Sequence, residues 1–256
     1  MAETFTKEYP SRGSAGAAAA HHRWLASLEA PVPDLLEATS EKLVFARVDG
    51  AHCHAADVPD VAALLGSLHA EAFKRELHAA NLDTPFSTSN GVLLASFVEP
   101  RVAWLGRHRR SGAISERQYD VAVAMITQAA RRPAAFYKDC NIRNVLMGNT
   151  SPVLVDFDDL TLAPFGYDLA KLLVSAAMTY GPLARSVYRE ALASYRQAVE
   201  ERQGPVNPCT WEELDTWLEI HALFTRPYLG RNGYRHRWSS RGLITAPDEE
   251  LGRQQT

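Results

Sequence analysis

The sequence predicts an α+β fold with two lobes, a reduced strand-containing lobe at residues 1–50 and a mainly helical lobe at residues 51–256. Two segments rich in β-forming residues precede residue 50, and from residue 57 onward apolar residues recur mostly at three- and four-residue spacings. The chain has 256 residues, 46% of them hydrophobic, which is enough for one large domain or two small lobes with a normal core. We expect the two-lobed arrangement.

The first lobe is predicted to contain short strands and one helix. Residues 4–9 alternate and are rich in β-formers until Pro10 ends them, which predicts a short strand whose one cation is Lys7. Residues 17–28 have helical composition, and the prolines that follow end the helix. Residues 34–39 are ambiguous, whereas residues 42–48 form a clear strand pattern ended by an Asp-Gly pair.

The second lobe is predicted to be mostly helical, with a few strands around one loop. A helix should start at Asp57, and a loop rich in Ser, Thr and Asn should follow at residues 81–91. Short apolar runs separated by polar turns predict strands at residues 134–137, 144–147 and 152–157. Further helices are expected at residues 100–110, 114–130, 168–179, 182–202 and 210–224.

Composition excludes several classes of protein. With 27 Lys plus Arg against 30 Asp plus Glu, the formal charge of -3 argues against a nucleic-acid binder. No apolar run reaches the ~18 residues that a membrane helix needs, and the charged start does not resemble an export signal. Three widely spaced cysteines suggest neither a disulfide framework nor a zinc site. We therefore expect a cytoplasmic globular protein.

One region carries the residues expected of chemistry. Asp139 and Asn144 stand five residues apart in a polar loop, and Asp156 follows the apolar strand pattern at residues 152–157. Phosphoryl transfer from ATP needs a carboxylate that orients the attacking hydroxyl and oxygen ligands that hold Mg²⁺ against the phosphates. A loop followed by a strand can bring these three side chains into one cleft.

The motif D-x-x-x-x-N, an apolar strand ending in D-F-D-D, and then Gly166-Tyr167-Asp168-Leu-Ala resembles the aminoglycoside phosphotransferase family of small-molecule kinases. The resemblance implies a protein-kinase-like bilobal fold and Mg²⁺-dependent transfer of a phosphoryl group from ATP, with GTP as the alternative, to a small-molecule hydroxyl. It implies these roles: Asp139 as catalytic base, Asn144 and Asp156 as metal ligands, Asp168 as structural support, Lys7 on the phosphates, and Phe45, Arg47 and Val48 at the nucleotide.

The sequence departs from the family pattern in three places. Tyr137-Lys138 stands where the family usually has His-Gly, only six residues precede Lys7, and the helix expected after Lys7 has no Glu between Ala15 and Trp24, only His21 and His22. These departures leave open a kinase-like pseudoenzyme that holds a ligand without phosphoryl transfer. They also leave open that Lys7 is an ordinary surface lysine.

The acceptor side is predicted from a basic and aromatic segment after the last helix. Arg226, Arg231 and Arg235 could receive an anionic acceptor and Tyr228 could stack on a ring, or the arginines could form a solvated face that pairs with nearby acids. Asp158 is a further candidate for acceptor binding, with metal assistance or capping of the next turn as alternatives. The acceptor is expected to be an antibiotic or a biosynthetic intermediate, and the oligomeric state is not predicted.

Overall fold

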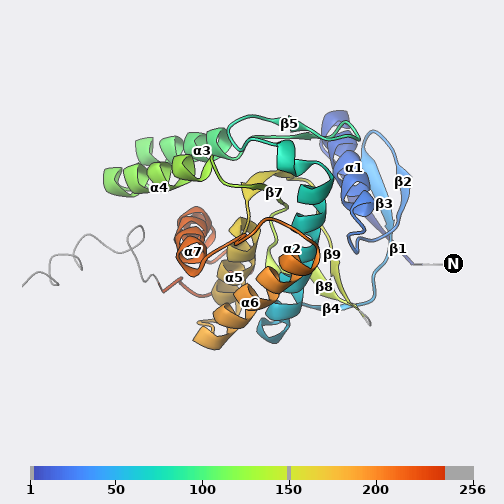
Figure 1. Ribbon diagram of the computed structural model, residues 1–256. Coiled ribbons are helices and arrows are strands. Elements are labelled where there is room, and N and C mark those ends of the chain that lie inside the picture. The colour runs from blue at the N-terminus through green and yellow to red at the C-terminus, as the bar shows by residue number, and fades with distance from the viewer. Residues whose placement is uncertain (1–2, 149–150, 240–256) are drawn as a thin grey trace, which may run out of the picture.

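The computed structural model describes residues 3–148 and 151–239 and has an α+β architecture. At one end lies an antiparallel sheet of order β1-β3-β2, formed by Thr4–Glu8, Lys42–Ala46 and Leu35–Ala38, with helix α1 (Arg12–Ser27) beside it (Figure 1). β1 pairs with β3 from Thr4 opposite Ala46 to Glu8 opposite Lys42. The ambiguous segment at 34–39 is thus a strand, because pairing with β3 decides what its composition leaves open.

Helix α1 begins five residues before the predicted start. Its N-cap is Ser11, whose side chain accepts a hydrogen bond from Ser14 N at 3.2 Å, so Gly13 and Gly16 lie within the helix. The Trp24 ring packs edge-on against Phe136, and Trp24 Nε1 donates a hydrogen bond to Glu76 Oε1 at 2.7 Å. Both partners lie outside the β1-β3-β2 sheet. The helix therefore joins the small sheet to the rest of the molecule.

The remaining described residues form helices around three small sheets. The helices are α2 (Val58–Arg75), α3 (Val98–Arg110), α4 (Glu116–Ala129), α5 (Tyr167–Tyr180), α6 (Arg185–Glu201) and α7 (Trp211–Thr225). The sheets are β4-β8-β9 (Ala51–His52, Val145–Met147, Pro152–Leu154), β7-β10 (Ala134–Tyr137, Thr161–Pro164) and β5-β6 (Phe86–Ser87, Leu93–Leu94). In Figure 1, α3 and α4 extend together to the side opposite the β1-β3-β2 sheet.

Two glycines permit the close packing that positions the core. Gly66 lies where α2 meets α6, and a Cβ there would overlap the Tyr195 carbonyl oxygen and lie 3.1 Å from Ala198 Cβ. Gly166 precedes α5 with φ of 81°, its N–H donates to the Tyr195 hydroxyl at 3.0 Å, and a Cβ would overlap Cys209 Sγ. Both positions therefore require glycine for space, and Gly166 also for its left-handed backbone.

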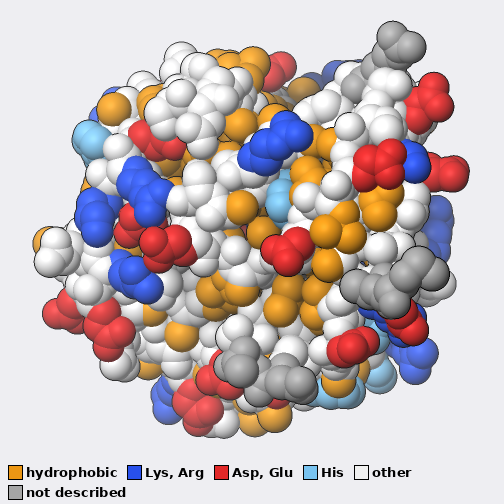
Figure 2. Space-filling view, turned by 90° about the vertical axis from the view of Figure 1, so that its right-hand side faces the viewer, with side chains coloured by type: hydrophobic (Ala, Val, Ile, Leu, Met, Phe, Trp, Pro, Cys, Tyr) orange, Lys and Arg blue, Asp and Glu red, His pale blue; other side chains and the backbone are white. Residues whose placement is uncertain are grey.

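Three further observations concern the cysteines, the hydrophobicity of the helices and the charges on one face. Cys53, Cys140 and Cys209 are all buried and unpaired, and none of them forms a disulfide. Among the helices that the structure describes, none combines the length and hydrophobicity needed to cross a bilayer. On the face that carries the β1-β3-β2 sheet, acidic, basic and hydrophobic side chains are interspersed (Figure 2).

Candidate functional site

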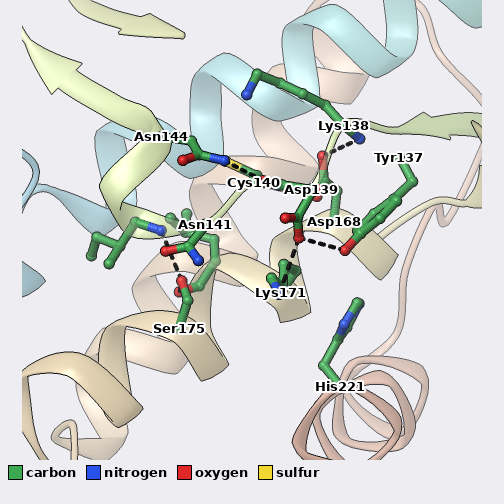
Figure 3. Close-up of polar contacts among 12 residues, drawn as sticks. Tyr137, Lys138, Asp139, Cys140, Asn141, Asn144, Asp168, Lys171, Ser175 and His221 are labelled. Atoms are coloured by element: carbon green, nitrogen blue, oxygen red, sulfur yellow. Dashed lines mark hydrogen bonds and ion pairs between the residues drawn. The ribbon is translucent and has the colours of Figure 1, made fainter. Parts of the chain in front are cut away.

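A buried carboxylate, that of Asp168, holds the loop that follows β7. Asp168, fully buried in the first turn of α5, accepts hydrogen bonds from Lys138 N at 3.1 Å and Cys140 N at 2.7 Å (Figure 3). Burial raises the pKa of Asp168 to about 6, although these two N–H groups lower it in part. Asp168 thus fixes the backbone on both sides of Asp139.

Asp139 stands at the tip of this loop with a left-handed backbone, φ 59°. Its Oδ1 accepts a hydrogen bond from the Tyr137 hydroxyl at 2.6 Å and forms an ion pair with Lys171 Nζ at 3.0 Å (Figure 3). Burial by itself raises the pKa of Asp139, but the charge of Lys171 and the bonds from Tyr137 and Lys171 outweigh it, so the pKa lies below its usual value. The carboxylate is therefore ionised at neutral pH.

A backbone hydrogen bond joins the segments that carry Asn144 and Asp156. Val155 N donates to Asn144 O at 2.9 Å, and Asn144 Nδ2 donates to the Asp139 carbonyl at 3.3 Å. Among the described residues, no donor bonds to Asn144 Oδ1. Asp156 also has a left-handed backbone, φ 68°. Strained backbone at two acidic residues of one site is typical of functional positions.

The donor set at Asn144 and Asp156 fits a magnesium ion. No cluster of three or more His, Cys, Asp or Glu side chains suited to a metal occurs among the described residues. Mg²⁺ requires less than that, because it is usually held by one or two carboxylates while phosphates and water complete its octahedron. A carboxylate and an amide oxygen on adjoining segments meet this requirement.

Lys7 reaches the same segment from β1. Its ammonium forms ion pairs with Asp156 Oδ1 at 2.6 Å and Asp158 Oδ2 at 2.7 Å, and Tyr9 donates to Asp158 Oδ1 at 3.0 Å. Partial burial lowers the pKa of Lys7, but the hydrogen bonds and charges of the two aspartates outweigh it and raise the pKa to about 12. The carboxylates that α1 lacks are thus supplied by the segment after β9.

Helix α1 contacts the same segment with a histidine in place of a glutamate. His21 Nδ1 lies 2.8 Å from the Phe157 carbonyl oxygen, and His22 packs edge-on against the Phe157 ring. Lys138, which stands where the family usually has Gly, is buried and donates from Nζ to the Val155 carbonyl at 2.8 Å. Both departures therefore support the backbone around Asp156.

A cavity of about 560 Å³ lies between β1, β3 and the segment around Asp156. It is lined by all the residues predicted for the nucleotide, namely Lys7, Phe45, Arg47 and Val48, and by Asp156. The size and the mixture of apolar side chains with three cations, Lys7, Arg47 and Arg143, are typical of a small-molecule site.

A second cavity, of about 750 Å³, lies on the other side of the loop. Asp139 and Lys171 line it, together with His221 and Tyr228 of the α7 region. Arg143 lines both cavities, and its guanidinium stacks 4.4 Å from the centre of the Tyr234 ring. The loop that carries Asp139 therefore lies between two cavities that share one arginine, Arg143.

Four residues predicted for the acceptor do not line this second cavity. Arg226, Arg231 and Arg235 are exposed, whereas Tyr228, Asn232 and Tyr234 of the same stretch line the cavity. Asp158 is engaged by Lys7 and Tyr9 on the nucleotide side. Of the predicted acceptor residues, only Tyr228 lines the cavity.

Sequence reasoning missed several residues of this site. Lys171 lies three residues after Asp168 on α5, and that spacing places both on one helix face, so the signal was present. Arg143 lies four residues after Asp139, in the short turn Ile142–Asn144 of the same loop. Arg101 gave no usable signal, because only the tertiary structure brings α3 against the second cavity.

Comparisons with known proteins agree with this geometry. The model of the phosphotransferase enzyme family matches residues 6–208. An amicoumacin kinase in complex with AMP-PNP, Ca²⁺ and Ami is 12% identical, with a TM-score of 0.66 over 98% of this chain and 79% of that one. A macrolide 2'-phosphotransferase from Brachybacterium faecium is 19% identical, with a TM-score of 0.57 over 89% and 78% of the two chains.

An aminoglycoside-3'-phosphotransferase of type VIII is 20% identical, with a TM-score of 0.55 over 87% of this chain and 85% of that one. No curated protein sequence matches the chain. At these identities the structural likeness concerns the fold, and it confirms the predicted protein-kinase-like α+β class.

Proposed function

This chain belongs to the phosphotransferase enzyme family, and on that premise we propose that it transfers the γ-phosphoryl group of ATP to a hydroxyl group of a small molecule. Small-molecule kinase activity is what the family and the structural neighbours share. One observation carries the proposal for this chain: a braced loop presents Asp139 to one cavity, while Lys7 and Asp156 line the other.

Asp139 is the residue that would orient the acceptor hydroxyl and take its proton. Its ionised state is supported by Lys171 at 3.0 Å and Tyr137 at 2.6 Å, and Asp168 keeps the loop in place. Holding hydroxyl and phosphate in fixed geometry supplies most of the acceleration in phosphoryl transfer.

Asn144 and Asp156 would hold Mg²⁺, which when bound neutralises charge on the phosphates. Lys7 is paired with Asp156 and Asp158 in this structure, so nucleotide binding would exchange these carboxylates for phosphate oxygens. The adenine would lie along Phe45, Arg47 and Val48, with GTP as the alternative nucleotide.

The acceptor belongs to the same proposal. The structural neighbours include an amicoumacin kinase and a macrolide 2'-phosphotransferase, which supports an antibiotic or a biosynthetic intermediate as acceptor. A cytoplasmic location is supported by the three unpaired cysteines.

Calorimetric titration of ATP and GTP, with and without Mg²⁺, tests the nucleotide site without knowledge of the acceptor. We expect Mg²⁺-dependent binding that Asp156→Ala abolishes and that the control Asp83→Ala, on an exposed loop, retains. Full retention of Mg²⁺-dependent binding by Asp156→Ala would contradict the role given to Asp156.

A second candidate function is a kinase-like binding protein without phosphoryl transfer. It is favoured by one observation, that Lys7 is held by the two carboxylates of the metal-binding segment and receives none from α1. Absence of nucleotide binding in the same titration would favour this candidate.

A further inference from the structure

The second cavity has an excess of positive charge. Four cations line it, Arg101, Arg107, Arg143 and Lys171, against two carboxylates, Asp139 and Asp159. Within the described part of the chain, the only ion pair among these six side chains is that of Lys171 with Asp139. The other three cations therefore share the cavity with one further carboxylate, Asp159, and among the described residues none of them is paired with it.

Arg101 is the most informative of them because it is 8% exposed. Its Nε donates to the Tyr167 hydroxyl at 3.0 Å, one terminal nitrogen to the Phe97 carbonyl at 2.9 Å, and the other to Thr161 Oγ1 at 3.2 Å. All three acceptors are neutral. A guanidinium has five N–H groups and stays protonated in proteins, so two N–H groups and a full charge remain.

Aromatic rings surround this guanidinium without neutralising it. Its carbon lies 4.3 Å from the centre of the Phe97 ring, 5.2 Å from Tyr137 and 4.7 Å from Tyr167. Such contacts stabilise a cation and hold it in one orientation. Burial of a charge without a counter-ion is nevertheless costly, which an anionic ligand in the cavity would offset.

Arg107 adds a second arginine of α3 to the lining of this cavity. Arg101, Trp104 and Arg107 follow one another at three-residue spacings on α3, and all three line the cavity. Arg107 is exposed and takes part in no ion pair among the residues described. Arg143 lines both cavities, whereas Arg101 and Arg107 line only the second and are therefore assigned to the acceptor.

We propose that the acceptor is a hydroxy compound that carries an anionic group, a carboxylate or a phosphate, and that Arg101 and Arg107 of α3 bind this group while the hydroxyl reaches Asp139. The inference rests on the proposed function and specifies its substrate class. It also predicts that a polycationic acceptor is repelled from this cavity.

Three probes that share a hydroxymethylphenyl group and carry an anionic, a neutral or a cationic substituent test this inference: 4-(hydroxymethyl)benzoate, 4-(hydroxymethyl)benzamide and 4-(hydroxymethyl)benzylamine. Their binding is measured by saturation-transfer NMR and calorimetry on the full chain, first alone and then with Mg²⁺ and ADP. ADP release from ATP is recorded for each in a coupled assay. We expect the benzoate to bind at least about tenfold more tightly than the benzylamine.

Variants locate the anion. Arg107→Gln should weaken benzoate binding by about fivefold, whereas Arg110→Gln, at the exposed end of the same helix and outside the cavity lining, should leave it unchanged. Arg101→Lys keeps the positive charge but removes the planar guanidinium, so it tests whether the paired N–H donors of Arg101 are needed for benzoate binding. The melting temperature of this variant shows whether it folds.

Each outcome is decisive. Equal binding of the three probes, preference for the benzylamine, failure of the benzoate to bind at millimolar concentration, or an unchanged affinity in Arg107→Gln would overturn the inference. Selective binding of the benzoate without ADP release or nucleotide binding would leave the anion site in place and refute the kinase function instead.

Discussion

Replacement of Lys7 by methionine separates a phosphate-binding lysine from a surface lysine. The substitution keeps an unbranched stem of similar length and removes the charge. In the nucleotide-free protein it deletes two ion pairs, at 2.6 and 2.7 Å, whose side chains are 28% exposed for Lys7, 46% for Asp156 and 40% for Asp158. Partly exposed pairs contribute about 0.2–1 kcal/mol each, so we expect unfolding free energy to fall by about 1 kcal/mol.

The effect on nucleotide binding should be larger than the effect on stability. A hydrogen bond between a cation and phosphate contributes about 1.5–3 kcal/mol, and tenfold in Kd corresponds to about 1.4 kcal/mol. Lys7 gives up its two aspartates to make this bond, which favours the lower end of the range. We therefore expect Kd for Mg²⁺-ATP to rise at least about tenfold, measured by calorimetry at neutral pH.

Lys42 on the neighbouring strand β3 supplies the control. It pairs with Glu37 at 3.2 Å, with side chains 42% and 51% exposed, and does not line the nucleotide cavity. Lys42→Met should change neither affinity nor, beyond about 0.5 kcal/mol, stability. An unchanged affinity in Lys7→Met, or an equal loss in Lys42→Met, would refute the role of Lys7.

Three further predictions concern the base, the core and pH. Asp139→Asn should lower turnover by at least about a hundredfold in an ADP-release assay while Mg²⁺-ATP affinity is retained, and retained turnover would exclude Asp139 as the base. Gly66→Ala should cost about 1–3 kcal/mol in urea denaturation through overlap with the Tyr195 carbonyl, whereas Gly16→Ala, which meets open space on α1, should stabilise by about 0.5–1 kcal/mol; equal effects would contradict the close packing of α2 on α6. The pKa of Asp168 is raised to about 6 from 3.8, so its contribution to stability is full below pH 3.8 and is lost as pH rises through 6. Wild type should therefore lose about 3 kcal/mol more than Asp168→Asn between these limits, and parallel pH profiles of the two proteins would contradict the shift.

The sequence predicted the elements whose local signals agree with their tertiary environment. The loop with Asp139 and Asn144, the strand before Asp156 and the helix that carries Asp168 all lie at the predicted positions. Each combines turn chemistry or apolar periodicity with a distinct polar residue, so local reasoning suffices. The family and the fold class followed from this one region.

The elements that were missed depend on contacts distant in sequence. Strand β10 is only four residues long, and it becomes a strand through pairing of Thr161 with Tyr137 and Pro164 with Ala134. The acceptor-side arginines were predicted from the segment after α7, but the cations that line the cavity include Arg101 and Arg107 of α3. Helix periodicity does not specify which neighbour a helix face meets, so no local pattern could have identified them.

The reactivity of the three buried cysteine thiols reports local opening of the fold. Burial raises the pKa of Cys53 to about 12, and it also raises the pKa of the Cys140 and Cys209 thiols, so all three are unreactive while folded. They lie on three segments of the chain: Cys53 directly after β4, Cys140 in the loop after β7, and Cys209 against Gly166. Alkylation followed by mass spectrometry would therefore record, without an introduced label, the order in which these regions open.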